Sequence, residues 1–186
     1  MKIRALLTML VLGSLTCGPD KVVVAKADLP HDTEQDAPEP TLSPAAALWQ
    51  KSVAAETAGN FEGALSALTE LPPPQRDGYL ANFRRGWLLY RAGRYTDAVT
   101  AYNAAMLIDP AGIEARVALL VPLMALKKWN DVASAAQEVL KRDPENYLAS
   151  QRLAYAKFSM QRYPEAELLY RRLVELYPGD VEMRAG

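Results

Sequence analysis

Three prolines recur at one fixed interval in the second half of this chain. Pro110, Pro144 and Pro178 are each separated from the next by 34 residues. An internal period of this length is typical of a solenoid in which every repeat adds one pair of helices to a continuous stack. The period therefore predicts a binding scaffold and argues against a catalyst.

Counting backward from the prolines divides the chain into blocks with shared positions. The blocks are 45–78, 79–112, 113–146 and 147–180. The second block has small residues, Gly86, Ala98 and Ala105, at its eighth, twentieth and twenty-seventh positions. A small residue that faces another helix lets the two backbones pack near the short end of the usual separation of ~8–10 Å. The seventeenth position is aromatic in all blocks: Phe61, Tyr95, Trp129 and Tyr163.

These small and aromatic positions resemble the tetratricopeptide repeat, a helix–turn–helix unit of the same length. The resemblance covers residues 45–180 and implies an all-α fold, a right-handed solenoid of about four stacked antiparallel helix pairs. Good helix formers dominate this region, and no run of alternating Val, Ile or Thr predicts a strand. Residues 181–186 are interpreted as the start of an incomplete further repeat.

The last expected helix, over residues 164–177, has no complete successor to cover it. Its apolar residues are Leu168, Leu169, Leu173, Val174 and Leu176. Because each unit of a repeat array exposes an apolar side to the next unit, we expect a bare apolar face at this end. Two explanations stay open, namely self-association through this face and a chain that is a piece of a longer array.

Three features depart from the repeat pattern. Leu71 is followed by three prolines, which cannot continue a helix, so the second helix of the first block is expected to end near Leu71. Asn82 and Arg85 replace a bulky apolar pair, which puts the packing of the second block against the first in question. Pro122 lies inside the first helix of the third block, where we expect it to bend that helix without ending it.

The charges of the chain are nearly balanced. The net charge is −1, and the repeats carry 16 Lys and Arg against 15 Asp and Glu. Non-specific nucleic-acid binding needs a concentrated basic face, so this balance predicts that nucleic acid is not a partner. One local cluster consists of Arg84, Arg85, Arg91 and Arg94. We interpret this cluster as a solvated face, with a site for an acidic partner segment as the alternative.

The sequence contains no recognisable catalytic constellation. His31 is the only histidine and Cys17 the only cysteine, so a catalytic triad or a histidine metal site cannot be assembled. The glycines of the repeats are isolated and form no phosphate-binding loop. We therefore predict that the protein is not an enzyme and uses no cofactor or metal.

Residues 1–27 are expected to form an export signal. Lys2 and Arg4 precede an apolar run over residues 5–16 that is short for a membrane-spanning helix. Three interpretations remain open: lipidation of Cys17, since the segment resembles a bacterial lipoprotein signal; cleavage after Ala27, where Ala25 supplies the second small residue; and an uncleaved anchor. Each of them exports the protein, to the periplasm or as a lipoprotein attached to the outer membrane.

Residues 28–44 are predicted to be a disordered linker. The segment contains five acidic residues, four prolines and no Lys or Arg. Such a segment cannot bury enough apolar surface to fold. It would act as a spacer that holds the repeats away from a membrane surface.

The concave groove is the predicted partner-binding site. In the resembled family, the first helix of each repeat lines the groove, and most of the matching residues here are aromatic or aliphatic. Aromatic anchors commonly dominate interface energies, although some of these side chains, Trp49 especially, could instead complete the core. The predicted groove residues are Trp49, Val53, Leu80, Phe83, Trp87, Tyr90, Arg91, Val117, Val121, Met124, Gln151, Tyr155 and Phe158.

Two functions follow as hypotheses. The first is a non-catalytic scaffold of the bacterial cell envelope that binds an apolar peptide or helix, as an adaptor in an envelope, secretion or pilus assembly. The second is an accessory module of an envelope enzyme system whose catalytic activity lies in another chain. Both use the groove, and they differ in the identity of the partner.

Lipidation of Cys17 predicts that the mature protein partitions with membranes and incorporates labelled palmitate. The acyl chains would hold the protein at the bilayer, so Cys17→Ser should abolish both properties. Mass spectrometry of the mature N-terminus checks this prediction. An unmodified N-terminus at Asp28 would contradict lipidation and establish simple secretion.

Overall fold

The computed structural model describes residues 42–179, and within them the chain forms helices and turns and no strand. The expectations for the export signal, for Cys17, for the linker up to residue 41 and for residues 181–186 lie outside the described residues. The helices are α1 (Pro44–Thr57), α2 (Phe61–Thr69), α3 (Pro73–Arg76), α4 (Tyr79–Arg91), α5 (Tyr95–Ile108), α6 (Glu114–Ala125), α7 (Trp129–Arg142), α8 (Tyr147–Ser159) and α9 (Tyr163–Leu176).

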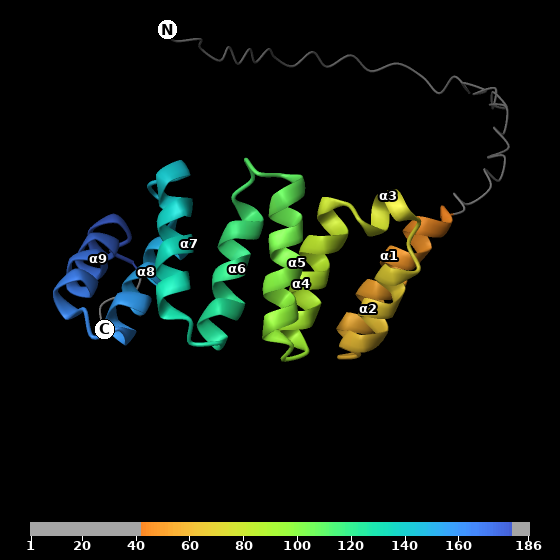
Figure 1. Cartoon of the computed structure of the whole chain (residues 1–186), viewed down its shortest axis with the longest axis horizontal. Coiled ribbons are helices and arrows are strands. Elements are labelled where there is room, and N and C mark those ends of the chain that lie inside the picture. Colours follow the sequence, from red (N-terminus) through yellow and green to blue (C-terminus); the bar gives the residue numbers. More distant parts are fainter. Residues whose placement is uncertain (1–41, 180–186) are drawn as a thin grey trace, which may run out of the picture. The chain divides into compact units, whose positions relative to one another are not determined.

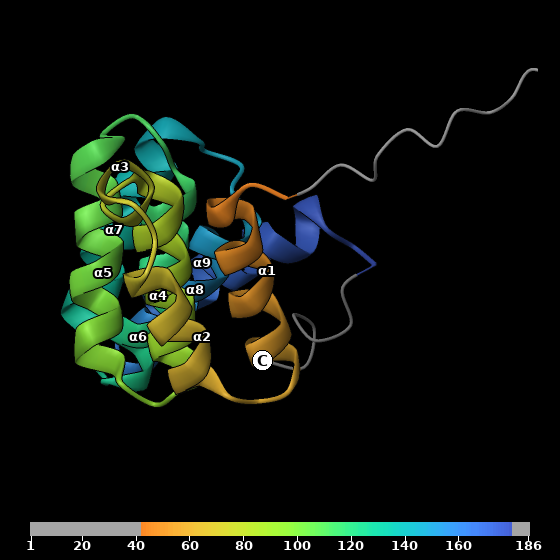
Figure 2. The ribbon, with the colours of Figure 1, turned by 90° about the vertical axis from the view of Figure 1, so that its right-hand side faces the viewer.

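The long helices form antiparallel pairs that stack in chain order (Figure 1). Helix α1 packs on α2, α4 on α5, α6 on α7 and α8 on α9, and each pair also contacts the next one. Figure 2 views this stack from its α1 end, so that later pairs lie behind earlier ones. The prediction of an all-α solenoid of stacked helix pairs is confirmed.

The turn inside each pair is built around one residue with a left-handed backbone. The φ angle is 76° at Gly59, 77° at Gly93, 54° at Lys127 and 61° at Gln161. These positions follow the period of the sequence. Glycine adopts this conformation without a steric penalty, whereas a residue with a Cβ atom pays about 1–2 kcal/mol. The third and fourth pairs therefore keep the turn at some cost in stability.

Small residues allow the helices of a pair to approach closely. A Cβ atom added to Gly86 on α4 would lie 2.8 Å from the ring of Tyr102 on α5. Ala98 and Ala105, which also lie on α5, are fully buried. The close contact that the sequence predicted at these positions is confirmed.

Two large clusters of buried residues hold the stack together. The first cluster joins the first two pairs and comprises Ala64, Leu65, Leu68, Leu71, Ala81, Leu88, Leu89, Ala98 and Ala101. The second extends from α5 to α8 and comprises Tyr102, Leu119, Leu120, Leu123, Val132, Ala133, Ala136, Val139, Ala149, Leu153 and Ala156. Helix α5 contributes to both clusters, so it connects the two halves of the core.

Asn82 and Arg85 form hydrogen bonds at the start of α4, and their effect on the packing between the first two pairs remains an open expectation. Asn82 Nδ2 donates to the carbonyl oxygens of Asp77 and Gly78, at 3.0 and 3.1 Å. Arg85 Nη1 donates to Asn82 Oδ1 at 2.6 Å. These polar side chains fasten the start of α4 to the preceding turn, while apolar residues of α4 pack in the first buried cluster.

Prolines follow the end of one helix, begin a second and lie inside a third. Helix α2 ends at Thr69, close to the predicted end at Leu71. The three prolines then begin a short helix, α3, that the sequence analysis did not predict; a proline at the first helical position loses no backbone hydrogen bond. Helix α6 continues through Pro122 to Ala125, as predicted, whereas the bend remains a prediction.

The apolar residues of α9 are less exposed than the sequence suggested. Leu173 is 1% exposed because it packs against α8, and Leu169 and Val174 are half-buried. Leu168 and Leu176 are exposed, at 68% and 47%. The bare apolar face expected on this helix is therefore smaller than predicted.

We expect Ala98→Leu to destabilise the fold by roughly 1–3 kcal/mol, because the added atoms overpack the contact between α4 and α5. Urea unfolding followed by circular dichroism measures the change. Ala47→Leu, at an exposed position of α1, serves as the matched control and should change stability little. Equal stability of the wild type and Ala98→Leu would contradict the close-contact role of this position.

Candidate functional site

A cavity of about 450 Å³ opens between α4, α6 and α8. Five predicted groove residues line it: Phe83, Trp87 and Tyr90 on α4, and Val117 and Val121 on α6. The other lining residues are Tyr102, Ile113, Glu114, Ala118, Asn146, Leu148 and Arg152. The structure thus gathers part of the predicted groove set around one largely apolar space.

A second cavity, of about 220 Å³, lies further along the stack. It contains three more predicted residues, Met124 on α6 and Gln151 and Tyr155 on α8, together with Arg152 and Tyr170. Arg152 lines both cavities, so the two spaces meet at this side chain. The groove is therefore two neighbouring apolar cavities and not one uniform channel.

The other five predicted groove residues line neither of these cavities. Trp49 is half-buried and packs against the first core cluster, as the alternative interpretation of this residue proposed. Val53, Leu80 and Phe158 are exposed, at 50%, 68% and 52%. Arg91 stacks on aromatic rings of its own chain. The first pair therefore contributes little to the cavities.

A polar network joins α1 to α4 beside the larger cavity. Glu56 Oε2 lies 2.8 Å from Arg84 Nη2, and Trp87 Nε1 donates to Glu56 Oε1 at 2.6 Å. Arg84 Nε also donates to the buried hydroxyl of Ser52 at 3.0 Å. The side chains of Glu56 and Arg84 are each only 20% exposed. This network fixes the indole ring of Trp87 at the cavity edge.

The arginine cluster is a solvated face only in part, because Arg91 and Arg94 are exposed and the other two members are not. Its members are Arg84, Arg85, Arg91 and Arg94. Arg84 and Arg85 are partly buried and bind the groups described above. The guanidinium of Arg91 lies 5.0 Å from the ring centre of Phe61 and 5.3 Å from that of Trp87. Arg94 forms ion pairs with Glu62 and Asp97.

Four polar residues of the larger cavity were absent from the predicted set: Tyr102, Glu114, Asn146 and Arg152. Tyr102 is 2% exposed. Burial raises the pKa of Tyr102 to about 12. Arg152 Nη1 donates to the carbonyl oxygen of Val117 at 2.7 Å, and burial lowers the pKa of Arg152.

A sequence signal existed for both Tyr102 and Arg152. Arg152 stands at a position that carries an arginine in members of the resembled family that clamp a C-terminal carboxylate, although the other clamp positions do not match. Tyr102 lies on α5, and the family rule assigns the groove to first helices alone. However, Gly86 stands opposite Tyr102, and a glycine there is what leaves room for the ring. Arg152 directly follows Gln151, at a position that the rule does not include. Its role depends on which way a long side chain extends, and the repeat pattern does not specify this.

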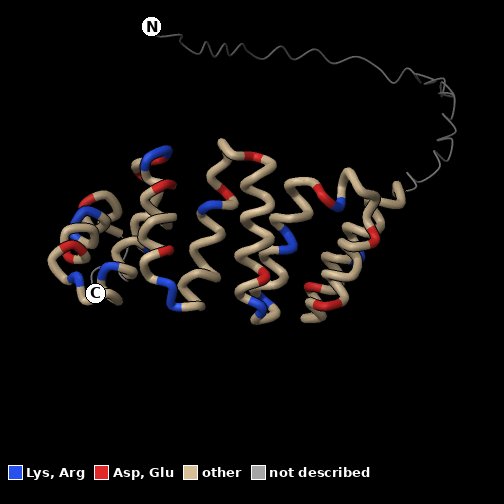
Figure 3. The backbone as a smooth tube through the Cα atoms, in the orientation of Figure 1, with Lys and Arg blue, Asp and Glu red and all other residues tan. Residues whose placement is uncertain are grey.

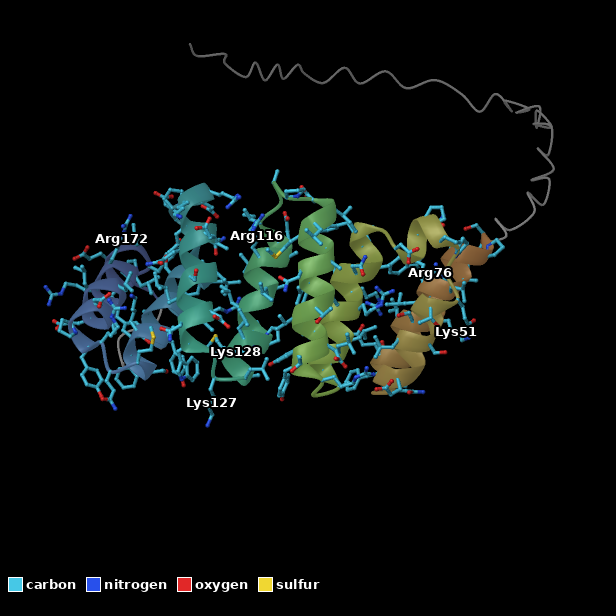
Figure 4. The ribbon with its side chains drawn as sticks, in the orientation of Figure 1. Lys51, Arg76, Arg116, Lys127, Lys128 and Arg172 are labelled. Atoms are coloured by element: carbon cyan, nitrogen blue, oxygen red, sulfur yellow. The ribbon has the colours of Figure 1, made fainter. Side chains whose placement is uncertain are left out.

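Charges are distributed without a dominant sign along the stack. Lys and Arg alternate with Asp and Glu over the helices (Figure 3). Cations such as Lys127 and Arg172 project outward from the ribbon (Figure 4). Among residues 42–179, no group of three or more His, Cys, Asp or Glu is placed to hold a metal ion. In the same region, no helix has the length and apolar character that crossing a membrane requires.

We expect Glu56→Ala to lower the free energy of unfolding by about 1–2 kcal/mol, because it leaves Arg84 without its counter-ion in a poorly solvated place. It should also shift the fluorescence of Trp87, which loses its hydrogen-bond acceptor. A double-mutant cycle with Arg84→Met isolates the pair energy. Strictly additive effects would show that the ion pair does not contribute to stability.

Comparison with known proteins agrees with this architecture. Models of the tetratricopeptide repeat match residues 79–111 and 123–185, together just over half of the chain. No curated protein matches the sequence. The crystal structure of MamA protein has a TM-score of 0.66 at 18% identity, covering 74% of this chain and 75% of that chain.

Other solved structures show the same likeness. MamA 41-end from Desulfovibrio magneticus RS-1 has a TM-score of 0.64 at 19% identity, over 72% of this chain and 76% of that one. The first TPR of Spaghetti (RPAP3), bound to an HSP90 peptide, has a TM-score of 0.55 at 24% identity, over 57% and 85%. At such identities these likenesses concern the fold alone. Together with the family matches, they show that the chain belongs to the tetratricopeptide repeat family, whose fold is a protein–protein interaction module.

Proposed function

We propose that this protein is a non-catalytic adaptor of the bacterial cell envelope that binds an apolar peptide or helix of a partner protein in the cavity between α4, α6 and α8. The observation that carries the proposal is the exposure of large apolar side chains around this cavity. Trp87 is 38% exposed and Leu148 is 42% exposed. Covering apolar surface of this kind contributes about 25 cal/mol per Å².

The size and rigidity of the cavity support this proposal. A volume of about 450 Å³ lies within the range of ~300–1,000 Å³ that is typical of ligand pockets. Trp87 is held by Glu56 and by the stacked guanidinium of Arg91. A ring that is already fixed loses little conformational entropy when a partner binds, which favours affinity.

The location in the cell envelope rests on the N-terminal sequence. Lys2 and Arg4, the apolar run over residues 5–16 and the lone Cys17 together favour export. An acidic, proline-rich segment then separates this region from the repeats. This order suits a repeat domain that is held at a membrane surface and reaches a partner beyond it.

Site-specific crosslinking in cells tests the function. A photoreactive amino acid replaces Val121 in the cavity wall, and a second variant carries it at Leu107, which is 82% exposed and lines neither cavity. Capture of one envelope protein from Val121 but not from Leu107 supports the adaptor. Capture of an envelope hydrolase or transferase would instead favour an accessory module of an enzyme system. No cavity-specific product would contradict both.

We expect Trp87→Ala and Tyr90→Ala each to weaken binding of the captured partner by more than ~1 kcal/mol, because both rings line the cavity. Titration calorimetry with the purified partner measures the loss. Leu107→Ala is the control, and it should bind like the wild type. If both cavity variants unfold the domain, the rings belong to the core and the groove assignment fails.

A further inference from the structure

A further cavity, of about 340 Å³, lies between α2 and α4, on the side of α4 that faces away from the groove. Residues two positions apart lie about 200° apart around a helix, so Arg85 and Leu89 are on the side opposite to Phe83 and Trp87. We call this space the α2–α4 cavity. The residues of its lining that matter here are Glu62, Leu65, Arg85, Leu89 and Arg94.

Arg85 is a charged residue at a position that is apolar in the later helix pairs. Leu119 and Leu153 stand at the same position one and two repeats further on, and they are 7% and 5% exposed. The third and fourth pairs therefore pack without a charge at this place. A guanidinium that replaces a buried leucine loses part of its hydration, and this burial lowers the pKa of Arg85.

Arg85 forms no ion pair among residues 42–179. Its Nη1 atom donates to Asn82 Oδ1 at 2.6 Å and its Nη2 atom donates to the carbonyl oxygen of Arg76 at 3.3 Å, and both acceptors are uncharged. The nearby carboxylate of Asp77 pairs with Arg76 instead, at 3.0 Å. A guanidinium has five N–H donors, so these two bonds leave donors for a further acceptor. Because a desolvated charge without a counter-ion is costly, an anion in the cavity would be bound favourably.

The other charged groups of the cavity limit the charge of that anion. Arg94 Nη2 lies 2.8 Å from Asp97, and Arg94 Nη1 lies 3.3 Å from Glu62. Arg94 thus already pairs with two carboxylates, whereas Arg85 pairs with none in the described part of the chain. The carboxylate of Glu62 would also repel a second negative charge in the same space. A ligand with one negative charge therefore suits the cavity better than a phosphate dianion.

The size and the apolar part of the cavity indicate what carries this charge. Leu65 lines the space from α2 and Leu89 lines it from α4. An acidic side chain of a partner protein would bring only one or two methylene groups and would leave much of the space empty. A volume of about 340 Å³ is at the lower end of the range of ~300–1,000 Å³ that is typical of small-molecule pockets. The cavity therefore fits a small organic acid whose carbon chain lies against the leucines.

We propose that the α2–α4 cavity binds a small organic acid with one carboxylate and a short apolar carbon chain, at a site separate from the groove. The carboxylate accepts hydrogen bonds from Arg85 N–H groups, and such charge-assisted bonds are stronger than neutral ones. The carbon chain contacts Leu65 and Leu89. A ligand held there touches α2 and α4 together, so it stabilises the contact between the first two pairs. Those two pairs also carry the network that fixes the ring of Trp87.

Titration of the full chain with sodium hexanoate, followed by NMR of labelled arginine and leucine, tests the proposal. We expect saturable shifts of the Arg85 Nε–H signal and of the Leu65 and Leu89 methyl signals, with a dissociation constant on the order of 1 mM for so small a ligand. Hexanamide has the same carbon chain without the charge, and acetate has the charge without the chain. Each should bind there roughly tenfold more weakly or worse. Equal affinities for hexanoate and hexanamide, or no saturable shift at these residues, would overturn the proposal.

Variants assign the effect to Arg85. In Arg85→Met, the preference for hexanoate over hexanamide at the two leucines should fall to about twofold or less, whereas Arg85→Lys should keep part of it. Arg152→Met is the matched control, since Arg152 is also a half-buried arginine but lines the groove cavities, and this variant should keep the whole preference. An undiminished preference in a folded Arg85→Met variant would overturn the assignment. If that variant does not fold, the Arg85 Nε–H signal of the wild type decides. It must shift with the same dissociation constant as the leucine methyl signals, and an unmoved signal would overturn the proposal.

Discussion

The contact between Gly86 and the ring of Tyr102 is the constraint on which the functional part of this structure depends. It brings α4 and α5 close enough that a single methyl group on Gly86 would clash with the ring. The same ring joins the second core cluster and forms part of the wall of the larger cavity. Helix separation, core packing and cavity shape therefore all involve this one glycine–aromatic contact.

Much of the fold could be predicted because the residues that specify it recur every 34 positions in the sequence. The prolines and the aromatic residues locate helix ends, and the four left-handed turn residues repeat at the same interval. What the period could not predict are the local departures from it. Helix α3 arises from three prolines that were interpreted only as a stop signal. Asn82 and Arg85 were compared only with the apolar residues usual at their positions, whereas their hydrogen bonds hold the turn before α4.

The candidate site was predictable to the extent that it follows the same repeat. Phe83, Trp87 and Val121 were placed in the groove by their repeat positions, and the cavity contains them. Trp49 satisfied the same rule, but it packs against the first core cluster and lines neither cavity. Arg152 was left out of the groove set because the family rule does not assign its repeat position to the groove. Long side chains can reach a cavity from several positions, so position alone does not determine what lines it.

The first helix pair has a structural role that its sequence positions concealed. Glu56 stands one repeat before Tyr90, a predicted groove residue, but its carboxylate contacts Arg84 and the indole of Trp87. Two charges of low exposure are thereby neutralised, and the edge of the cavity becomes rigid. The first helix pair thus supports the site from outside it. Removing this pair would release the Trp87 ring and leave the partly buried Arg84 without its counter-ion.

The two core clusters meet at α5, and the larger cavity lies at the same junction. In a repeat array, stability is approximately a sum of unit terms and nearest-neighbour terms, so a break between two units costs only one interface. A segment bound across α4, α6 and α8 would contact three successive units at once. It would thereby stabilise two interfaces together, because any ligand that binds only the folded stack shifts the equilibrium toward it. A partner bound at this site would therefore link the folding of the two halves of the array. Binding and cooperative folding would then reinforce each other.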